Sequence, residues 1–218
     1  MVKKEKILVT GSQSKIYKEL KKLLPRNSSV TEFTSKKMDM SNLDLVKKKL
    51  DFFLSFDKII FLQGLLIGKK QNKKPSNQIY DQFTVNLLSI VEICEYVLDK
   101  NKNVKIVIVG SESGVKGSFD KTYFLSKSAL HHYVEEKKIK FKKQQLICIS
   151  PSTIGDSKMT INRIDKQKLL LSKKLNPKKR FVKSSELSKL IYMFLYEITD
   201  YITNTVIHVN GGKFSRMK

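Results

Sequence analysis

The sequence predicts an α/β fold, in which one doubly wound parallel sheet carries helices on both faces. Segments typical of strands alternate with segments typical of helices along the whole chain. The strand segments are apolar without regular polar alternation, as expected where both faces of a parallel sheet are covered. The 218 residues contain no internal repeat and no Pro/Gly-rich linker, so we expect a single domain over residues 1–218.

Six short runs of apolar and β-branched residues predict the strands. They occupy residues 6–10, 29–33, 57–62, 104–109, 145–150 and 204–209. Gly11, Gly64 and Pro151 close the first, third and fifth runs, and these residue types interrupt extended pairing. The fourth run, VKIVIV, is the most hydrophobic and indicates a central strand.

The segments between these strands predict helices. SKIYKELKKLL repeats apolar residues at helical spacing and stops at Pro25, and SNLDLVKKKLDFF begins at Ser41, which is suited to cap a helix. The stretch between the second and third strands is short, so we expect a trimmed helix there. Further helices are predicted over residues 76–101, 122–138 and 184–198, and basic loops over 69–74 and 171–183.

The composition is strongly basic. A formal net charge of +23 arises from 43 Lys and Arg against 20 Asp and Glu. Solvated lysine-rich faces, attraction of an anionic substrate and nucleic-acid binding are the three interpretations. The lysines are spread along the whole chain, and no helix-turn-helix, zinc-finger or RNP-type signature occurs, which disfavours nucleic acid as a partner.

Cysteine and histidine usage indicates neither disulfides nor a metal site. Cys94 and Cys148 lie far apart in apolar stretches, so we expect buried free thiols in a reducing cytoplasm. The three histidines form no metal-ligating pattern.

No apolar run reaches the ~18–20 residues needed to span a bilayer. The start, MVKKEKILVTG, lacks the apolar core of a signal peptide, so we expect no membrane partner.

Loops that follow four of the predicted strands contain small and hydroxyl-bearing residues. They read TGSQS, FLQG, GSESG and SPSTIG. In doubly wound sheets, ligands bind beyond the carboxyl ends of the strands, and small residues let backbone amides approach a phosphate. Each loop alone is equally typical of an ordinary turn, but their recurrence in order indicates a ligand site.

One Tyr/Lys pair lies in a context that suits catalysis. Tyr123 and Lys127 are four residues apart, which places them on one face of a helix. The same spacing occurs at Tyr17/Lys21, Tyr96/Lys100 and Tyr133/Lys137. Of the four pairs, Tyr123/Lys127 alone follows a hydroxyl-bearing loop after a central strand and opens a helix there, so we interpret the other three as surface or packing residues.

In this order, the motifs resemble those of the short-chain dehydrogenase/reductase family, which has a single-domain Rossmann-like fold. The resemblance extends from Lys6 to Gly212. Ser111 matches the family's catalytic serine, Tyr123 and Lys127 match its YxxxK motif, and Asn86 matches its helix asparagine. It further implies a cofactor site made of Gly11, Ser12, Gln13, Lys15, Ile16, Lys36, Asp39, Met40, Gln63, Gly64, Tyr123, Lys127, Pro151 and Ile154.

The resemblance implies a role for each catalytic residue. Tyr123 donates a proton to the developing alkoxide, and Lys127 lowers the pKa of this phenol, ordinarily near 10. Ser111 hydrogen-bonds the substrate carbonyl. Asn86 positions a water through its helix backbone. The expected activity is hydride transfer between NAD(P) and a carbonyl or alcohol, by a homodimer or homotetramer.

The glycine-rich opening departs from the family pattern. Lys15 and Tyr17 stand where two of three glycines are usual, so an inactive or weakly active binding protein on the same scaffold is the alternative. The second strand is followed by Lys36 and Lys37 rather than an acid, which favours NADP(H) over NAD(H). Residues 156–183 are expected to cover the substrate, and their basic charge favours an anionic small molecule such as a nucleotide-linked sugar.

Overall fold

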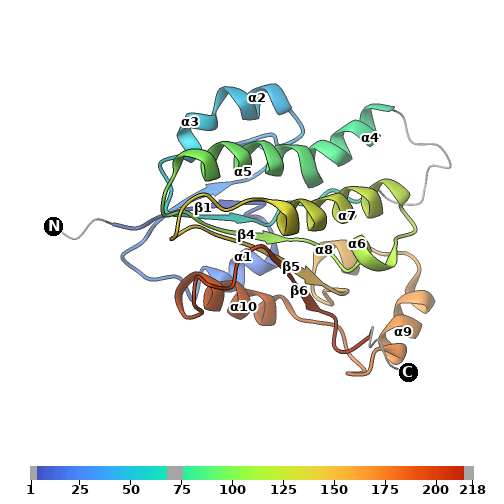
Figure 1. Cartoon of the computed structure of the whole chain (residues 1–218). Coiled ribbons are helices and arrows are strands. Elements are labelled where there is room, and N and C mark those ends of the chain that lie inside the picture. The colour runs from blue at the N-terminus through green and yellow to red at the C-terminus, as the bar shows by residue number, and fades with distance from the viewer. Residues whose placement is uncertain (1–3, 68–75, 214–218) are drawn as a thin grey trace.

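Six parallel strands form the centre of the structure, a computed structural model that describes residues 4–67 and 76–213 (Figure 1). The strands are β1 (Lys6–Thr10), β2 (Ser29–Phe33), β3 (Lys58–Phe61), β4 (Lys105–Val109), β5 (Gln145–Pro151) and β6 (Thr205–Val209). Their order in the sheet is β2-β1-β3-β4-β5-β6, and every neighbouring pair is parallel. The predicted α/β fold with a doubly wound parallel sheet is confirmed.

Helices cover both faces of the sheet (Figure 1). The described helices are α1 (Lys15–Leu20), α2 (Leu43–Lys48), α3 (Leu50–Phe53), α4 (Ser76–Phe83), the π-helix η1 (Thr84–Leu88), α5 (Ser89–Lys100), α6 (Ser113–Lys116), α7 (Lys121–Glu136), α8 (Lys158–Ile161), α9 (Lys166–Leu175) and α10 (Ser184–Tyr196). The helices α1 and α10 lie on one face, and α2, α3, α5 and α7 lie on the other.

Two apolar layers hold the helices against the sheet. Because side chains alternate along a strand, Ile7 and Val9 of β1 face α1 and α10, whereas Leu8 faces the helices on the other side. All three side chains are fully buried. Burial of one such aliphatic side chain contributes about 1.5–3 kcal/mol, so the central strands fix the sheet firmly.

The topology places a crevice at one edge of the sheet. The chain runs from β1 outward to β2, then returns to add β3 to β6 on the other side of β1. The strand order therefore reverses between β1 and β3. In doubly wound sheets, ligands bind outside the carboxyl ends of the strands at this switch point.

The structure corrects the predicted helices at several places. The cap of α2 is Asn42 rather than Ser41, because the Asn42 side chain accepts a hydrogen bond from the Leu45 N–H at 2.9 Å. The helix predicted over 76–101 is interrupted by η1, whose wider turn is frequent at functional sites. The loop predicted over 171–183 begins inside α9. The basic segment 69–74 lies outside the described residues.

Other features agree with the composition. Cys94 and Cys148 are both buried and free, as predicted. Within residues 4–67 and 76–213, no helix combines the length and apolar character required to cross a membrane.

Candidate active site

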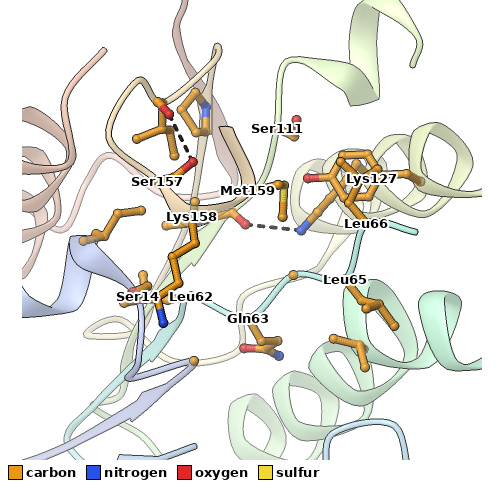
Figure 2. Close-up of a pocket in the computed structure, with 18 of the residues that line it drawn as sticks. Ser14, Leu62, Gln63, Leu65, Leu66, Ser111, Lys127, Ser157, Lys158 and Met159 are labelled. Carbon is orange, nitrogen blue, oxygen red and sulfur yellow. Dashed lines mark hydrogen bonds between the residues drawn. The ribbon is translucent and has the colours of Figure 1, made fainter. Parts of the chain in front are cut away.

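A cleft of about 810 Å³ opens at the carboxyl edge of the sheet. Its walls come from the residues that follow β1, β2, β3, β4 and β5, the arrangement that the topology predicts. The volume lies within the ~300–1,000 Å³ range of small-molecule sites. Figure 2 shows part of the lining, where Ser111, Lys127, Lys158 and Met159 surround one region of the cleft.

The turn after β1 requires glycine at its first position. Gly11 has φ +64, and a Cβ on this residue would lie 2.6 Å from the Gln63 backbone nitrogen. The loops after β1 and β3 therefore touch backbone to backbone. Ser14 ends the turn and caps α1, since its side chain accepts a hydrogen bond from the Tyr17 N–H at 3.1 Å.

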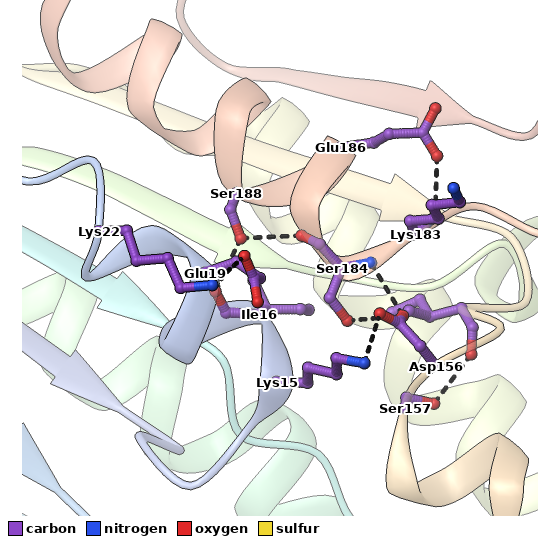
Figure 3. Close-up of polar contacts among 11 residues, drawn as sticks. Lys15, Ile16, Glu19, Lys22, Asp156, Ser157, Lys183, Ser184, Glu186 and Ser188 are labelled. Atoms are coloured by element: carbon purple, nitrogen blue, oxygen red, sulfur yellow. Dashed lines mark hydrogen bonds and ion pairs between the residues drawn. The ribbon is translucent and has the colours of Figure 1, made fainter.

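The two side chains that replace glycines leave the cleft open. Tyr17 is only 3% exposed and does not line the cleft, because its ring packs beneath α1 in the apolar layer shared with α10. Its hydroxyl donates to Glu32 Oε1 in β2 at 2.5 Å. Lys15 lies at the rim and forms an ion pair with Asp156 at 3.2 Å (Figure 3).

The start of α7 positions the Tyr/Lys pair. Asp120 caps this helix by accepting a hydrogen bond from the Tyr123 N–H at 3.1 Å, and Lys127 follows one turn later. The Lys127 ammonium lies 5.9 Å from the centre of the Tyr123 ring and donates to the Val109 carbonyl at 3.4 Å (Figure 2). Ser111, from the loop after β4, lines the same cleft as both residues. The structure thus brings together three of the four predicted catalytic residues.

Burial dominates the proton affinities of this group. The pKa of Tyr123 is raised by burial, although hydrogen bonding with Ser111 opposes this increase. Burial lowers the pKa of Lys127 to about 8. The direction of this change reflects burial, and the expected lowering of the phenol pKa by Lys127 stays a prediction. Tyr123 consequently holds its proton at neutral pH, as a proton donor must.

Asn86 lies behind the cleft rather than in its lining. This residue of η1 is fully buried, and its side chain joins the loop after β3. The Leu65 N–H donates to Asn86 Oδ1 at 2.8 Å, and Asn86 Nδ2 donates to the Leu65 carbonyl at 2.9 Å. Asn86 Nδ2 also donates to Ser126 Oγ in α7 at 3.3 Å. Its side chain therefore fixes the cleft wall next to α7.

Most residues predicted to bind the cofactor line the cleft. They are Gly11, Gln13, Lys15, Ile16, Asp39, Met40, Gln63, Gly64, Tyr123, Lys127, Pro151 and Ile154. Ser12 and Lys36 do not line it: Ser12 is buried, with its N–H donating to the Phe33 carbonyl at 3.2 Å, and Lys36 is exposed. The cofactor-binding role of the whole set stays a prediction.

Several residues that line the cleft belong to none of the sequence motifs. Five of them are Ser157, Lys158, Met159, Thr160 and Arg163, which lie within α8 or within two residues of its ends. All belong to residues 156–183, the segment predicted to cover the substrate, so their region was indicated although the individual residues were not. Their side chains reach the cleft because the loop after β5 folds back over the sheet edge, which periodicity alone does not reveal.

Comparison with known proteins decides the family. A family model described as short chain dehydrogenase matches residues 2–168. The chain belongs to the short-chain dehydrogenase/reductase family. It is therefore an oxidoreductase that acts on a CH–OH or C=O group with NAD(P).

Individual relatives agree with this assignment. The chain is 30% identical over 190 residues to the 3-oxoacyl-[acyl-carrier-protein] reductase FabG of Buchnera aphidicola, with 82% of this chain and 76% of the relative covered. A short chain dehydrogenase family protein from Francisella tularensis superposes with a TM-score of 0.80 at 22% identity, over 97% of this chain and 99% of that chain. A small-chain dehydrogenase in complex with NADPH gives 0.79 at 19% identity, over the same shares of the two chains.

The cleft of this family member fits a dinucleotide. Tyr17 points away from it, and the Gly11 turn keeps the loop after β1 tight against the loop after β3. Gln63 Oε1 accepts a hydrogen bond from Thr10, whereas the Gln63 Nε2 donor is buried without a partner among the described residues. Because Gln63 lines the cleft, an acceptor group of a bound molecule would be a suitable partner once the side chain turns toward it.

Proposed function

We propose that this chain is an NADP(H)-dependent oxidoreductase that reduces a carbonyl, or oxidises an alcohol, with Tyr123 as the proton donor. The observation that carries the proposal is the convergence of Ser111, Tyr123 and Lys127 on one cleft. The bound nicotinamide supplies the hydride. The neutral phenol of Tyr123 supplies the proton to the developing alkoxide, and the hydroxyl of Ser111 holds the substrate oxygen.

Lys127 acts through charge and position. With a pKa lowered to about 8, it remains mostly an ammonium at neutral pH, and its charge stabilises the Tyr123 phenolate that forms when the proton leaves. Asn86 holds the adjoining wall through Leu65 and Ser126. We further propose that the backbone of Asn86, within η1, positions a water.

The preference for NADP(H) is supported by the end of β2. Thr34 and Ser35 line the cleft there with hydroxyls. The carboxylate of β2, Glu32, is engaged by the Tyr17 hydroxyl and by Lys21, so it is not free to bind a ribose diol. Lys36 and Lys37 are exposed beside this wall and suit a 2′-phosphate.

The proposed substrate is an anionic small molecule, such as a nucleotide-linked sugar. Its support is the net charge of +23 together with the excess of basic residues in the segment 156–183. A 3-oxoacyl thioester is the second candidate, favoured by the activity in the name of the Buchnera relative.

We further propose that the protein is cytoplasmic, has a single domain, and forms a homodimer or homotetramer. Light scattering of the purified protein tests the oligomeric state.

Calorimetric titration with NADPH and with NADH tests the function most directly. We expect both to bind, NADPH more tightly. Absence of binding by either dinucleotide at millimolar concentration would refute the oxidoreductase proposal and favour a binding protein on the same scaffold. A panel of nucleotide-linked sugars and 3-oxoacyl thioesters, followed by NADPH absorbance, then separates the two substrate classes.

A further inference from the structure

Lys158 is an exposed cation of the cleft wall that has no counter-charge among the described residues. It is the first residue of α8, whose cap Ser157 accepts a hydrogen bond from the Thr160 N–H at 3.2 Å. Figure 2 shows its side chain extending from α8 toward Ser14, in the loop that precedes α1. In the part of the chain that the structure describes, no carboxylate lies within ion-pair distance of Lys158.

The other cations that line the cleft are already engaged. Lys15 pairs with Asp156 at 3.2 Å, and Arg163 binds both carboxylate oxygens of Asp165, at 2.9 and 2.7 Å. Lys127 is turned toward the Val109 carbonyl at 3.4 Å. Among the described residues, Lys158 is therefore the cation of this wall that neither pairs with a carboxylate nor lies beside Tyr123.

The pairing of Lys15 is held in place from a second side. Asp156 Oδ1 accepts hydrogen bonds from the Ser184 N–H at 2.9 Å and from the Ser184 hydroxyl at 2.8 Å (Figure 3). Asp156 is thus fixed at the start of α10 and keeps the ammonium of Lys15 at the rim. In this structure the charge of Lys15 is therefore directed to Asp156.

A dinucleotide carries its pyrophosphate past the turn after β1, where Gly11 and Ser14 line the cleft. Of the side chains that stand in place of glycines, Tyr17 is turned away from this turn and Lys15 is paired with Asp156. A lysine that reaches the same place from the opposite wall supplies a charge-assisted hydrogen bond, which a phosphate oxygen accepts readily.

We propose that Lys158 binds the pyrophosphate of the bound dinucleotide, from the wall opposite the loop before α1. This inference rests on the proposed function. It assigns to the segment after β5 a phosphate contact in addition to those of the loop after β1.

The test compares Lys158→Gln with a matched control, Lys168→Gln, an exposed lysine of α9 that does not line the cleft. Affinities for NADPH, ADP-ribose and adenosine 2′-monophosphate are measured by calorimetry at two salt concentrations. We expect Lys158→Gln to bind NADPH and ADP-ribose about tenfold more weakly, since both contain the pyrophosphate. Its affinity for adenosine 2′-monophosphate is expected to match that of the wild type, as are all affinities of Lys168→Gln.

The possible results separate this inference from the proposed function. If the wild type binds NADPH and Lys158→Gln binds it equally well, Lys158 does not contact the pyrophosphate, and the inference alone fails. An equal loss for adenosine 2′-monophosphate would also overturn it, because that ligand lacks a pyrophosphate. If the wild type binds no dinucleotide, the proposed function fails as well. A smaller salt dependence of NADPH binding in Lys158→Gln supports a lost ion contact.

Discussion

The Tyr17 hydroxyl in α1 donates a hydrogen bond to Glu32 Oε1 in β2 at 2.5 Å. This bond spans the edge of the sheet and turns the aromatic ring into the apolar layer beneath α1. Burial, followed by hydrogen bonding to Glu32, raises the pKa of Tyr17 above its usual value, so the phenol remains the donor. A residue that could have blocked the cofactor loop instead fastens α1 to the sheet.

Tyr17→Phe tests this arrangement. The variant keeps the buried ring and loses the hydrogen bond, while Lys21 continues to neutralise Glu32 at 2.8 Å. We expect the free energy of unfolding, measured by urea denaturation, to fall by about 1 kcal/mol. The affinity for NADPH should stay within twofold of the wild type. A severalfold loss of affinity would mean that the hydroxyl faces the dinucleotide after all.

Tyr123→Phe separates proton donation from binding. We expect turnover of whichever carbonyl substrate is identified to fall by about 10²–10⁴-fold, because general acid catalysis contributes an effect of that size. The NADPH affinity should be nearly unchanged. Tyr133→Phe, which alters another tyrosine of α7, outside the cleft lining, is the control. Normal turnover in Tyr123→Phe would show that another group donates the proton.

Lys127→Met tests whether catalysis costs stability. Burial lowers the pKa of Lys127 from 10.5 to about 8, so the folded state disfavours the ammonium. The stability lost by burying this ammonium is largest below about pH 8 and disappears above about pH 10.5, where Lys127 is neutral in both the folded and the unfolded state. We expect Lys127→Met to be more stable than the wild type at pH 7, by up to about 3 kcal/mol, and inactive. Equal stability of the two proteins at pH 7 would contradict this assignment.

His131 is expected to make the fold sensitive to acid. It lies one turn after Lys127, is 4% exposed, and has a pKa that burial, reinforced by Lys127 and His208, lowers to about 4. The folded state favours neutral His131, and this contribution to the free energy of unfolding is fully present above about pH 6.5. It is lost as the pH falls toward 4, because the unfolded state then binds a proton more readily. Between pH 7.5 and 4.5, the free energy of unfolding should therefore fall by about 2–3 kcal/mol less in His131→Asn than in the wild type. The exposed neighbour variant His132→Asn should retain that decrease.

Gly11→Ala tests the contact between the loops after β1 and β3. An added Cβ would lie 2.6 Å from the Gln63 nitrogen, and the φ of +64 is itself unfavourable for alanine. Gly212→Ala is the matched control, because its φ of +79 is also positive, an added Cβ would meet only Pro177 Cγ at 3.9 Å, and Gly212 does not line the cleft. We expect about 1 kcal/mol of destabilisation in the control and about 1–3 kcal/mol or more in Gly11→Ala. Only Gly11→Ala should weaken NADPH binding, and equal effects in both variants would remove the steric argument.

The sequence by itself determined the strands of the sheet and the order of the motifs that contain the proposed catalytic residues. Apolar runs closed by glycine or proline are local signals, so all six strands lie where periodicity predicts them. The position of Tyr123 and Lys127 after a central strand and its hydroxyl-bearing loop also follows from chain order. Helix details were predicted less well, because the cap at Asn42 and the turn of η1 depend on a few side-chain contacts.

Only the tertiary structure decided which way long side chains point. Tyr17 and Lys15 follow the same glycine, yet one is drawn under α1 by apolar packing and Glu32, and the other is held at the rim by Asp156. The proton affinity of Tyr123 likewise reflects burial from every side, which no spacing of residues can report. Lys158 reaches the cleft because a loop after β5 folds back over it, and contacts between distant segments are set by packing rather than by local pattern.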